Sequence, residues 1–475
     1  MFLKSSPPIL LGLALLTTLG ACSIGPDYVR PTPVADIPAS FRENWKPAEP
    51  QDQQIPADWW TLFDDATLNA LMAQVATSNQ TLAQAEANYR AASALVDNAR
   101  AAYLPSVTAD VSRTRSRSPQ AGISTVNSAG LSASWEIDIW GGVRRAVEVQ
   151  ENTALASYAN MRAIRLSMQS QLAQSYFQLR TLDAQKELLE RSVEEYQRSL
   201  KLTQNQLKSG VVATDSVLLA ETQLKSTQAQ ALDVGVQRAQ FEHAIATLIG
   251  KPASTFTIAA IPLGQDAYLP QLPEVLVALP SSLLERRPDV AAAERSVAAA
   301  NAQIGVTKAA FFPSLTLNGS GGYESSSLAK WISLPNRVWS VGPALAENLF
   351  DGGARLALNR QAKSAYDASV AGYRQTVLGA FQNVEDNLAA LRILKEEAVV
   401  QNGASVAARR ALEVTLNQYK AGTVNYLNVV TAQTTALTNQ RTELTITNSR
   451  LLATVQLIAA LGGGWNGLNK NDANP

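Results

Sequence analysis

Two long stretches of the chain carry a helical pattern of apolar and polar positions and contain no proline. Residues 120–251 and 344–474 lack proline altogether. Because a proline inside a helix costs about 3 kcal/mol, its absence permits long helices there. Apolar residues recur at helical spacing over residues 143–209 and 354–421. Each pattern predicts a helix of about 100 Å at 1.5 Å per residue, a length typical of coiled-coil-like packing.

Each long helix is expected to end at a glycine turn, Gly210 or Gly422, and to be followed by a second helix. The sequence therefore predicts two helical hairpins, over residues 141–250 and 352–462. Shorter helices are expected earlier in each half, over residues 61–102 and 282–310. The second of these opens with the letters SLLE, which fit a capping box.

Between the helical stretches, apolar and polar residues alternate with a period of two, as in residues 131–139. This alternation predicts two β-hairpins, each with one apolar face and one polar face. The hairpins are expected at residues 103–140 and 311–351, with polar segments 113–128 and 324–336 joining their strands. A soluble β-sandwich and a membrane-spanning barrel would both show this pattern.

Glycine pairs stand where the last strand of each β-hairpin is expected to pass into a long helix. The pairs are Gly141 with Gly142 and Gly352 with Gly353. Because only glycine adopts a positive φ freely, we interpret both pairs as structural hinges.

The chain nearly repeats itself, since four pairs of segments match in the same order at offsets of 208 to 213 residues. The matching segments are 99–111 with 307–319, 138–146 with 348–357, 205–217 with 417–429, and 245–250 with 458–463. Four matches in register indicate an internal duplication. Residues 251–281 are interpreted as a linker or equatorial region between the halves, and residues 463–475 as a C-terminal tail.

The single cysteine, Cys22, follows an apolar run near the start of the chain. Small residues precede it in the letters LGAC, which resemble a bacterial lipobox, and the layout is that of a secretory signal peptide. We therefore predict a signal peptide over residues 1–21 and a lipidated, extended segment over residues 22–60. Ser23 resembles the residue after the cysteine in lipoproteins of the outer membrane. The alternative is a plain signal peptide with a chance cysteine.

Composition argues against several functional classes. Forty basic and forty acidic residues balance, which gives no argument for a nucleic-acid partner. With one histidine and one cysteine, the sequence offers no metal-ligand cluster. No arrangement of residues suggests an enzyme active site or a cofactor site. Beyond the signal peptide, no stretch approaches the ~18 apolar residues of a transmembrane helix.

A lipid anchor changes the interpretation of the strands. Alternating strands of about ten residues in a membrane-held protein fit a transmembrane β-barrel. Four strands cannot close a barrel, since the smallest bacterial barrels have about eight. Several chains would therefore share one barrel, and the pattern leaves two, three or four copies open. The basic cluster RTRSRS at residues 113–118 would lie in an outward loop, either solvated or against lipopolysaccharide phosphate.

Four motifs are distinctive. They are CSIGPDYVRP at residues 22–31, DWWTLFDDATLNAL at 58–71, the run LLERRPDVAAAERS within 283–317, and FQNVEDNLAAL at 381–391. Together they resemble the outer-membrane factors, the TolC/OprM-like family, in its NodT-type lipoprotein branch. The resemblance implies a mixed α and β membrane protein: a homotrimer with a twelve-stranded outer-membrane β-barrel, four strands per chain, continued by a periplasmic α-helical barrel. The implied partners are a periplasmic adaptor, an inner-membrane transporter of the resistance–nodulation–division type, and outer-membrane lipid.

The resemblance also implies a periplasmic entrance at the tips of the helical hairpins, closed in the family by a tyrosine, an arginine and aspartates. The corresponding gate residues here are Tyr419, Val424, Leu427, Asn428 and Thr431 at the second tip and Asp215 after the first. Val424 stands at the arginine's position, and Asn428 and Thr431 stand at those of paired aspartates. Closure is therefore expected to rest on neutral hydrogen bonds and apolar packing. Asp215 could instead be an N-cap.

Three functions are compatible with this sequence. The leading hypothesis is a passive exit duct for toxic small molecules that a partner transporter delivers. A duct for protein secretion with an ATP-driven partner is a second. A structural periplasmic lipoprotein without a pore is a third.

Overall fold

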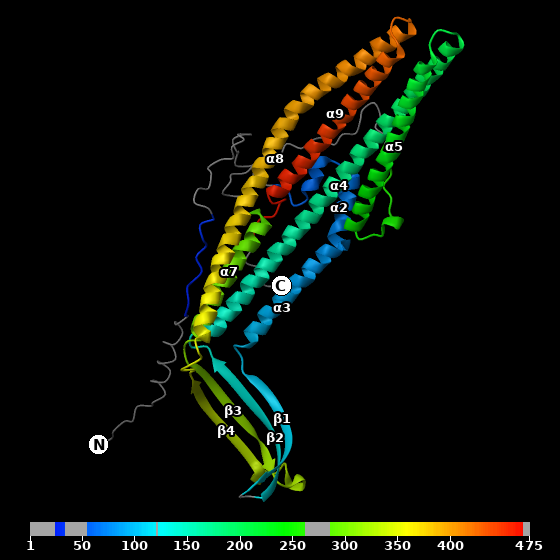
Figure 1. Ribbon diagram of the computed structural model, residues 1–475. Coiled ribbons are helices and arrows are strands. Elements are labelled where there is room, and N and C mark those ends of the chain that lie inside the picture. The colour runs from blue at the N-terminus through cyan, green and yellow to red at the C-terminus, as the bar shows by residue number, and fades with distance from the viewer. Residues whose placement is uncertain (1–23, 34–54, 120–121, 262–285, 469–475) are drawn as a thin grey trace.

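The computed structural model describes residues 24–33, 55–119, 122–261 and 286–468. Cys22, with the predicted signal peptide, lies outside them. The described chain consists of long helices with a four-stranded sheet at one end (Figure 1). Within the described part of the chain, no helix is both long and apolar enough to cross a membrane.

Two helical hairpins form the long part of the molecule. The long helices α4 (Gly142–Lys208) and α8 (Ala354–Lys420) contain 67 residues each. Their partners α5 (Thr214–Leu248) and α9 (Tyr426–Ala460) contain 35 residues each. These equal lengths follow from the internal duplication. In Figure 1 both hairpin tips point to the end of the molecule that lies away from the sheet.

The first predicted helix, over residues 61–102, is divided into a 3-10 turn η2 (Trp59–Phe63) and the helices α2 (Ala66–Ser78) and α3 (Gln80–Ala101). The prediction of one helix is therefore wrong, and Asn79 explains the break. Its backbone is extended, and its side chain accepts a hydrogen bond from the Leu82 N–H at 2.9 Å, which caps α3. Its amide also donates to the Leu248 carbonyl at 2.7 Å, which fixes the break against α5.

The short helix of the second half, α7 (Pro288–Ala309), begins later than the predicted residue 282. Pro288 occupies the first turn, where a missing N–H costs nothing, and Arg287 is the N-cap residue. The Arg287 side chain pairs with Asp289 at 2.6 Å and donates to the Ala460 carbonyl at 3.1 Å. The proposed SLLE capping box lies outside the described residues.

The sheet is antiparallel, with strand order β1-β2-β3-β4. Its strands are β1 (Ser106–Ser118), β2 (Gly122–Ile137), β3 (Ser314–Ser325) and β4 (Arg337–Ala346). No described strand of the chain pairs with the outer edges of β1 and β4. Unpaired edges of this length expose backbone N–H and C=O groups that another chain can satisfy.

The prediction that residues 113–128 form a polar connection is wrong. Strand pairing continues to Ser118 and Gly122, so this segment is mostly strand. Cross-strand hydroxyl pairs support its polar part, with Ser112 to Ser128 at 2.8 Å and Ser116 to Ser124 at 3.2 Å. The alternation of apolar and polar residues ends before the strand pairing of β1 with β2 ends. The connection between β3 and β4 does contain non-strand structure, in two short 3-10 turns.

The two faces of the sheet differ in chemistry. One face carries exposed apolar side chains, and the other carries serine, threonine and asparagine. A cavity of about 340 Å³ lies on the polar face, where its lining includes Thr108, Ser132 and Ser320, so that face is the concave one. The apolar face is therefore convex. Its exposed residues include Val107, Val111, Leu131, Trp339, Val341 and Leu345.

The hydrophobic cores lie among the helices. In the first, Trp59 and Phe63 pack beside Tyr176 and Phe177 of α4, with the ring centroids of Phe63 and Phe177 4.8 Å apart. This core also holds residues of α5 and α9, so it fastens the N-terminal segment and both hairpins together. A second core joins α7, α8 and α9 and includes the fully buried Tyr373.

The glycine pairs at the strand-to-helix junctions differ from one another. Gly141 has a φ of 76°, and Gly352 and Gly353 have φ values of 66° and 92°. These three positions need a left-handed backbone. Gly142 does not have a positive φ and is the first residue of α4. A Cβ at Gly142 would lie 3.2 Å from the Ala309 Cβ, so close packing against α7 explains this glycine, and the hinge interpretation is wrong there.

Gly353→Ala is expected to lower the stability of each chain by about 1–2 kcal/mol, because a left-handed backbone crowds a side chain. Nothing lies within 4 Å of the added Cβ, so backbone strain is the whole effect. Gly372→Ala is the control, since Gly372 lies within α8, has no positive φ and also has free space. This control is expected to be neutral or stabilising. Thermal unfolding followed by circular dichroism should show a lower midpoint for Gly353→Ala only.

Candidate functional site at the helix tips

Both hairpin tips have the same backbone design. After α4, the Gly210 N–H donates to the Leu207 carbonyl and the Val211 N–H to the Gln206 carbonyl, both at 2.9 Å. After α8, Gly422 and Thr423 repeat these bonds at 3.0 Å. Gly210 and Gly422 have φ values of 72° and 75°. Both tips are therefore Schellman-type ends that need glycine and present a short, fixed turn.

Tyr419 lies inside the tip region and not on its surface. Its side chain is 3% exposed, and its hydroxyl donates to Thr203 Oγ1 on α4 at 3.2 Å. Its ring packs edge-on against Tyr426 with centroids 5.2 Å apart. Tyr426, Val429 and Ala220 of α5 belong to the same cluster, and the half-buried Val424 packs against it. Tyr419 therefore joins the second hairpin to the first within one chain.

Asp215 occupies the first turn of α5 and is exposed. Its carboxylate accepts hydrogen bonds from the Ser216 N–H at 2.6 Å and from the Ser216 hydroxyl at 3.3 Å. The N-cap residue of α5 is Ala213, which makes no side-chain cap, so the alternative interpretation of Asp215 as an N-cap is wrong. A carboxylate in the first turn still interacts favourably with the helix dipole.

Leu427, Asn428 and Thr431 share the exposed face of α9 at the second tip. Leu427 is 54% exposed, and the Thr431 hydroxyl donates to the Leu427 carbonyl at 2.9 Å. The backbone N–H of Asn428 donates to the side chain of the N-cap residue Asn425 at 3.3 Å. The side-chain amide of Asn428 takes no part in this cap. This face is largely neutral and offers apolar and amide groups to whatever covers it.

The structure brings some of the predicted gate residues together and leaves others apart. Tyr419 and Val424 meet in the tip cluster. Within one chain, the Tyr419 hydroxyl bonds to neither Asp215 nor Asn428, because it lies on the side of α8 that faces α4. Thr203 and Tyr426 complete this contact and escaped sequence reasoning, since neither position stands out until the helices are packed.

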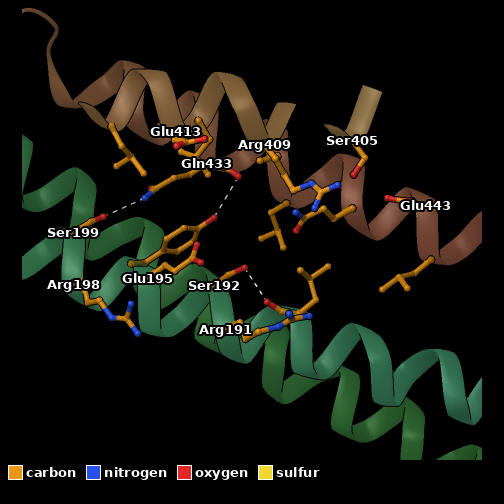
Figure 2. Close-up of a pocket in the computed structure, with 18 of the residues that line it drawn as sticks. Arg191, Ser192, Glu195, Arg198, Ser199, Ser405, Arg409, Glu413, Gln433 and Glu443 are labelled. Carbon is orange, nitrogen blue, oxygen red and sulfur yellow. Dashed lines mark hydrogen bonds between the residues drawn. The ribbon is translucent and has the colours of Figure 1, made fainter. Parts of the chain in front are cut away.

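A cavity of about 1080 Å³ separates the hairpins just behind the tips. Figure 2 shows its walls, formed by α4 on one side and by α8 and α9 on the other. Charged side chains of both signs line it, including Arg191, Glu195, Arg198, Arg409, Glu413 and Glu443. The cavity therefore lacks the single-sign lining that concentrates anions or cations.

Gln433 of α9 is the main polar bridge across this cavity. Its side-chain Nε2 donates to Ser199 Oγ at 3.3 Å, and its backbone carbonyl accepts from the Tyr196 hydroxyl at 3.3 Å (Figure 2). Both distances are at the long end of the hydrogen-bond range. The two hairpins are therefore joined by long hydrogen bonds along the cavity and by close aromatic packing at the tip.

A buried polar network that sequence reasoning missed fixes the other end of the hairpins. The Tyr176 hydroxyl donates to Asp65 at 2.6 Å and accepts from Arg180 Nε at 3.1 Å. Asp183 pairs with Arg180 at 3.0 Å and with Arg238 of α5 at 2.6 Å. The only sequence signal was the helical spacing of Arg180 and Asp183, which is common on solvated faces as well.

Glu242 extends this network to residues after α5. Burial raises the pKa of the Glu242 carboxyl, but hydrogen bonds from the Ile258 N–H and the Thr257 hydroxyl, with the charge of Arg238, outweigh burial. The net pKa lies below its ordinary value. Glu242 therefore stabilises the fold above the unfolded pKa, and this contribution is lost as the pH falls through the lower folded value.

Within the described residues, no group of three or more His, Cys, Asp or Glu side chains could hold a metal ion. The cavity and the concave sheet face are instead lined by hydroxyl, amide and mixed charged groups, and the tips are packed around an aromatic and apolar cluster. Such surfaces suit passage and contact between helices.

Comparison with known proteins gives the family. The family described as "Outer membrane efflux protein" matches residues 71–251 and 279–463, one match for each half of the duplication. The chain belongs to the outer membrane efflux protein family. Membership places it among the outer-membrane channel components of efflux systems, with the TolC-like fold. It also decides against a soluble sandwich for the strands.

Individual members support this assignment over the full length. Outer membrane protein OprJ of Pseudomonas aeruginosa is 32% identical over 472 residues, which cover 95% of each chain. Cation efflux system protein CusC of Escherichia coli is 28% identical, covering 97% of this chain and 99% of CusC. The solved structure of the outer-membrane channel OprN superposes with a TM-score of 0.87 at 30% identity, over 94% of this chain and all of OprN.

Proposed function

We propose that three copies of this chain form one outer-membrane channel, the exit duct of a tripartite efflux pump. The sheet carries the proposal, because its four strands leave both edges unpaired in the chain. Only a closed barrel satisfies every backbone group in lipid, so the edges of β1 and β4 must meet those of other copies. Three copies give twelve strands. The concave hydroxyl-lined face then becomes the lumen, and the convex apolar face contacts lipid.

In this proposal residues 103–140 and 311–351 cross the outer membrane, and the hairpins 141–250 and 352–462 form a duct in the periplasm. A periplasmic adaptor and an inner-membrane transporter of the resistance–nodulation–division type supply the cargo. The mixed charges of the hairpin cavity and the neutral tips favour a duct that selects little. One relative carries cation efflux in its name, but the partner transporter would choose the cargo here. The duct itself performs no chemistry and needs no cofactor.

The trimer is expected to persist in mild detergent and to conduct in planar bilayers. Native mass spectrometry of the purified full-length protein should give three times the mass of the mature chain. Bilayer recordings should then show discrete channels from the same preparation. A monomer that inserts stably would contradict the proposal, and a trimer without conductance would favour a structural lipoprotein.

We also propose that Cys22 carries lipid at the membrane surface. The Ile24 N–H donates to the Trp140 carbonyl at 3.1 Å, and the Trp140 ring stacks on Phe312 at 4.9 Å. These aromatic rings lie where the strands pass into the helices, a position typical of the membrane interface. Ile24, which follows Cys22 by two positions in the sequence, is therefore held beside that interface.

Mass spectrometry of the mature N-terminus is expected to find a lipid-modified Cys22. Cys22→Ser, exported through another signal peptide, should lose the modification and keep some outer-membrane insertion, because the barrel is itself a membrane element. A mature chain with an unmodified Cys22 would rule out the anchor without affecting the channel proposal.

A further inference from the structure

Charged residues divide between the two faces of the sheet by sign. Strand pairing is in register throughout, so odd-numbered residues share the convex face and even-numbered residues share the concave face. The carboxylates of the four strands are all on the concave face: Asp110, Glu136 and Glu324. The guanidinium groups are all on the convex face: Arg113, Arg115, Arg117 and Arg337. We call these four arginines the arginine ladder.

The arginine ladder begins where the apolar band of the convex face ends. Arg113 follows Val111 on that face of β1 and pairs with Asn127, whereas Val111 pairs with Ala129. Below that level, the convex face of β2 is apolar over residues 129–137. A strand that crosses a membrane needs about 9–11 residues, so this band has the required height. The ladder therefore lies at the edge of the lipid core.

The second edge strand carries its arginine at the last level of the apolar band, because Arg337 lies opposite Tyr323 and Tyr323 lies opposite Ala129. Arg337 of β4 pairs with Tyr323 of β3, and Trp339 follows it on the convex face. Aromatic residues of this kind mark the membrane–water interface. Figure 1 shows that this end of the sheet lies away from the helices. Since the helices extend into the periplasm, the ladder faces the outer leaflet.

The four guanidinium groups have no acidic partner in the described structure. All four residues are exposed, and no salt bridge of the described residues includes them. The carboxylates of the strands cannot reach them, because they project from the opposite face. Alternate residues of a strand are about 6.6 Å apart, so Arg113, Arg115 and Arg117 form a column of unpaired positive charge.

We propose that the arginine ladder binds the phosphate groups of lipopolysaccharide in the outer leaflet. The convex face is in contact with lipid, and its phosphorylated headgroups lie just beyond the apolar band. Arginine binds phosphate in a bidentate, charge-assisted manner, which makes it the suitable cation for this position. The proposal rests on the outer-membrane location and does not depend on which molecules are exported. It adds a headgroup site to a surface otherwise held by apolar contact.

The test compares binding of three lipid A preparations to the purified full-length protein in detergent. The probes are bisphosphorylated, monophosphorylated and dephosphorylated lipid A, with retained lipids counted by native mass spectrometry. The parent protein should bind the bisphosphorylated form most tightly. In Arg113→Gln/Arg115→Gln/Arg117→Gln/Arg337→Gln this preference should disappear, since each arginine near an anionic lipid surface contributes about fivefold in affinity. Excess inorganic phosphate should compete only weakly, because the apolar band also holds the acyl chains.

Two matched variants make the result specific. The same four positions changed to lysine should keep most of the preference, because the charge remains while bidentate contact is lost. Lys201→Gln/Lys225→Gln/Lys395→Gln removes exposed charge from the helices and should bind like the parent. If the fourfold variant assembles poorly, the double variant Arg115→Gln/Arg117→Gln, which changes only the end of β1, replaces it in the same binding test. The proposal is overturned if the glutamine variants keep the parent's preference, or if the helix variant loses it equally.

Discussion

Tyr419→Ala combined with Tyr426→Ala is expected to raise the resting conductance of the channel and to admit large antibiotics such as vancomycin. The two rings are 3% and 2% exposed and pack against each other, and Tyr419 also bonds to Thr203 of the other hairpin. Replacing a buried aromatic residue with alanine costs about 3–5 kcal/mol. A shift of about 5.5 kcal/mol takes a two-state gate from 1:99 to 99:1, and the proposed trimer repeats the loss three times.

The measurements are single-channel recordings and growth inhibition by vancomycin at equal protein abundance. Tyr373→Ala is the matched control, since Tyr373 is equally buried but packs against α7 and α9, far from the tip along α8. It should lower stability without opening the channel. Tyr419→Phe should have a smaller effect, because a neutral hydrogen bond contributes only about 0.5–1.5 kcal/mol. Parent-like conductance in the double variant would exclude the tip cluster as part of the gate.

The long-range plan of the fold could be predicted because its signals are local and repeated. Missing prolines permit the long helices α4 and α8, and Gly210 and Gly422 supply turns that other residues adopt only with strain. The internal duplication strengthened both predictions, because the proline-free stretch and the glycine turn each occur once in each half of the chain. The strands could be located for the same reason, through the alternation around β2.

Boundaries that depend on distant partners could not be predicted in this way. Asn79 breaks the first helix while its amide bonds to Leu248, far along the chain. Beyond the membrane core neither face of β1 needs to be apolar, so its polar end lacks the alternation of apolar and polar residues. Strand pairing with β2 nevertheless continues to Ser118. Alternation in a sequence arises where one face of a strand is in an apolar environment and the other in a polar one. It is absent where both faces of the strand are in polar surroundings.

The predicted gate residues show a similar limit at the level of single residues. Family resemblance pointed to Tyr419, but it could not show that the hydroxyl turns toward Thr203 of the same chain. Val424 packs against the tip cluster at the position where the resemblance implies an arginine. The contacts of Asp215, Asn428 and Thr431 with other copies stay a prediction, since their exposed faces would meet only in the trimer.

Asp183→Ala is expected to destabilise the protein by about 3–5 kcal/mol per chain, enough to impair assembly. The Asp183 side chain is 3% exposed and neutralises both Arg180 and Arg238, whose own side chains are 8% and 15% exposed. Removing it would leave the buried Arg180 guanidinium without the ion pair it makes in the described structure and would leave Arg238 paired with Glu242 alone. The loss would occur where α4 and α5 are fixed beside the first core. Thermal unfolding and the yield of detergent-stable trimer would measure it.

Glu190→Ala is the matched control on the same helix. Glu190 pairs with Lys186 at 3.7 Å, but its side chain is 59% exposed, and exposed ion pairs contribute about 0–1 kcal/mol. If both variants lose the same stability, the buried network has no special role, because alanine is the better helix former and would not by itself lower stability. If only Asp183→Ala loses trimer, the buried network is required to hold α4 and α5 in the arrangement that assembles.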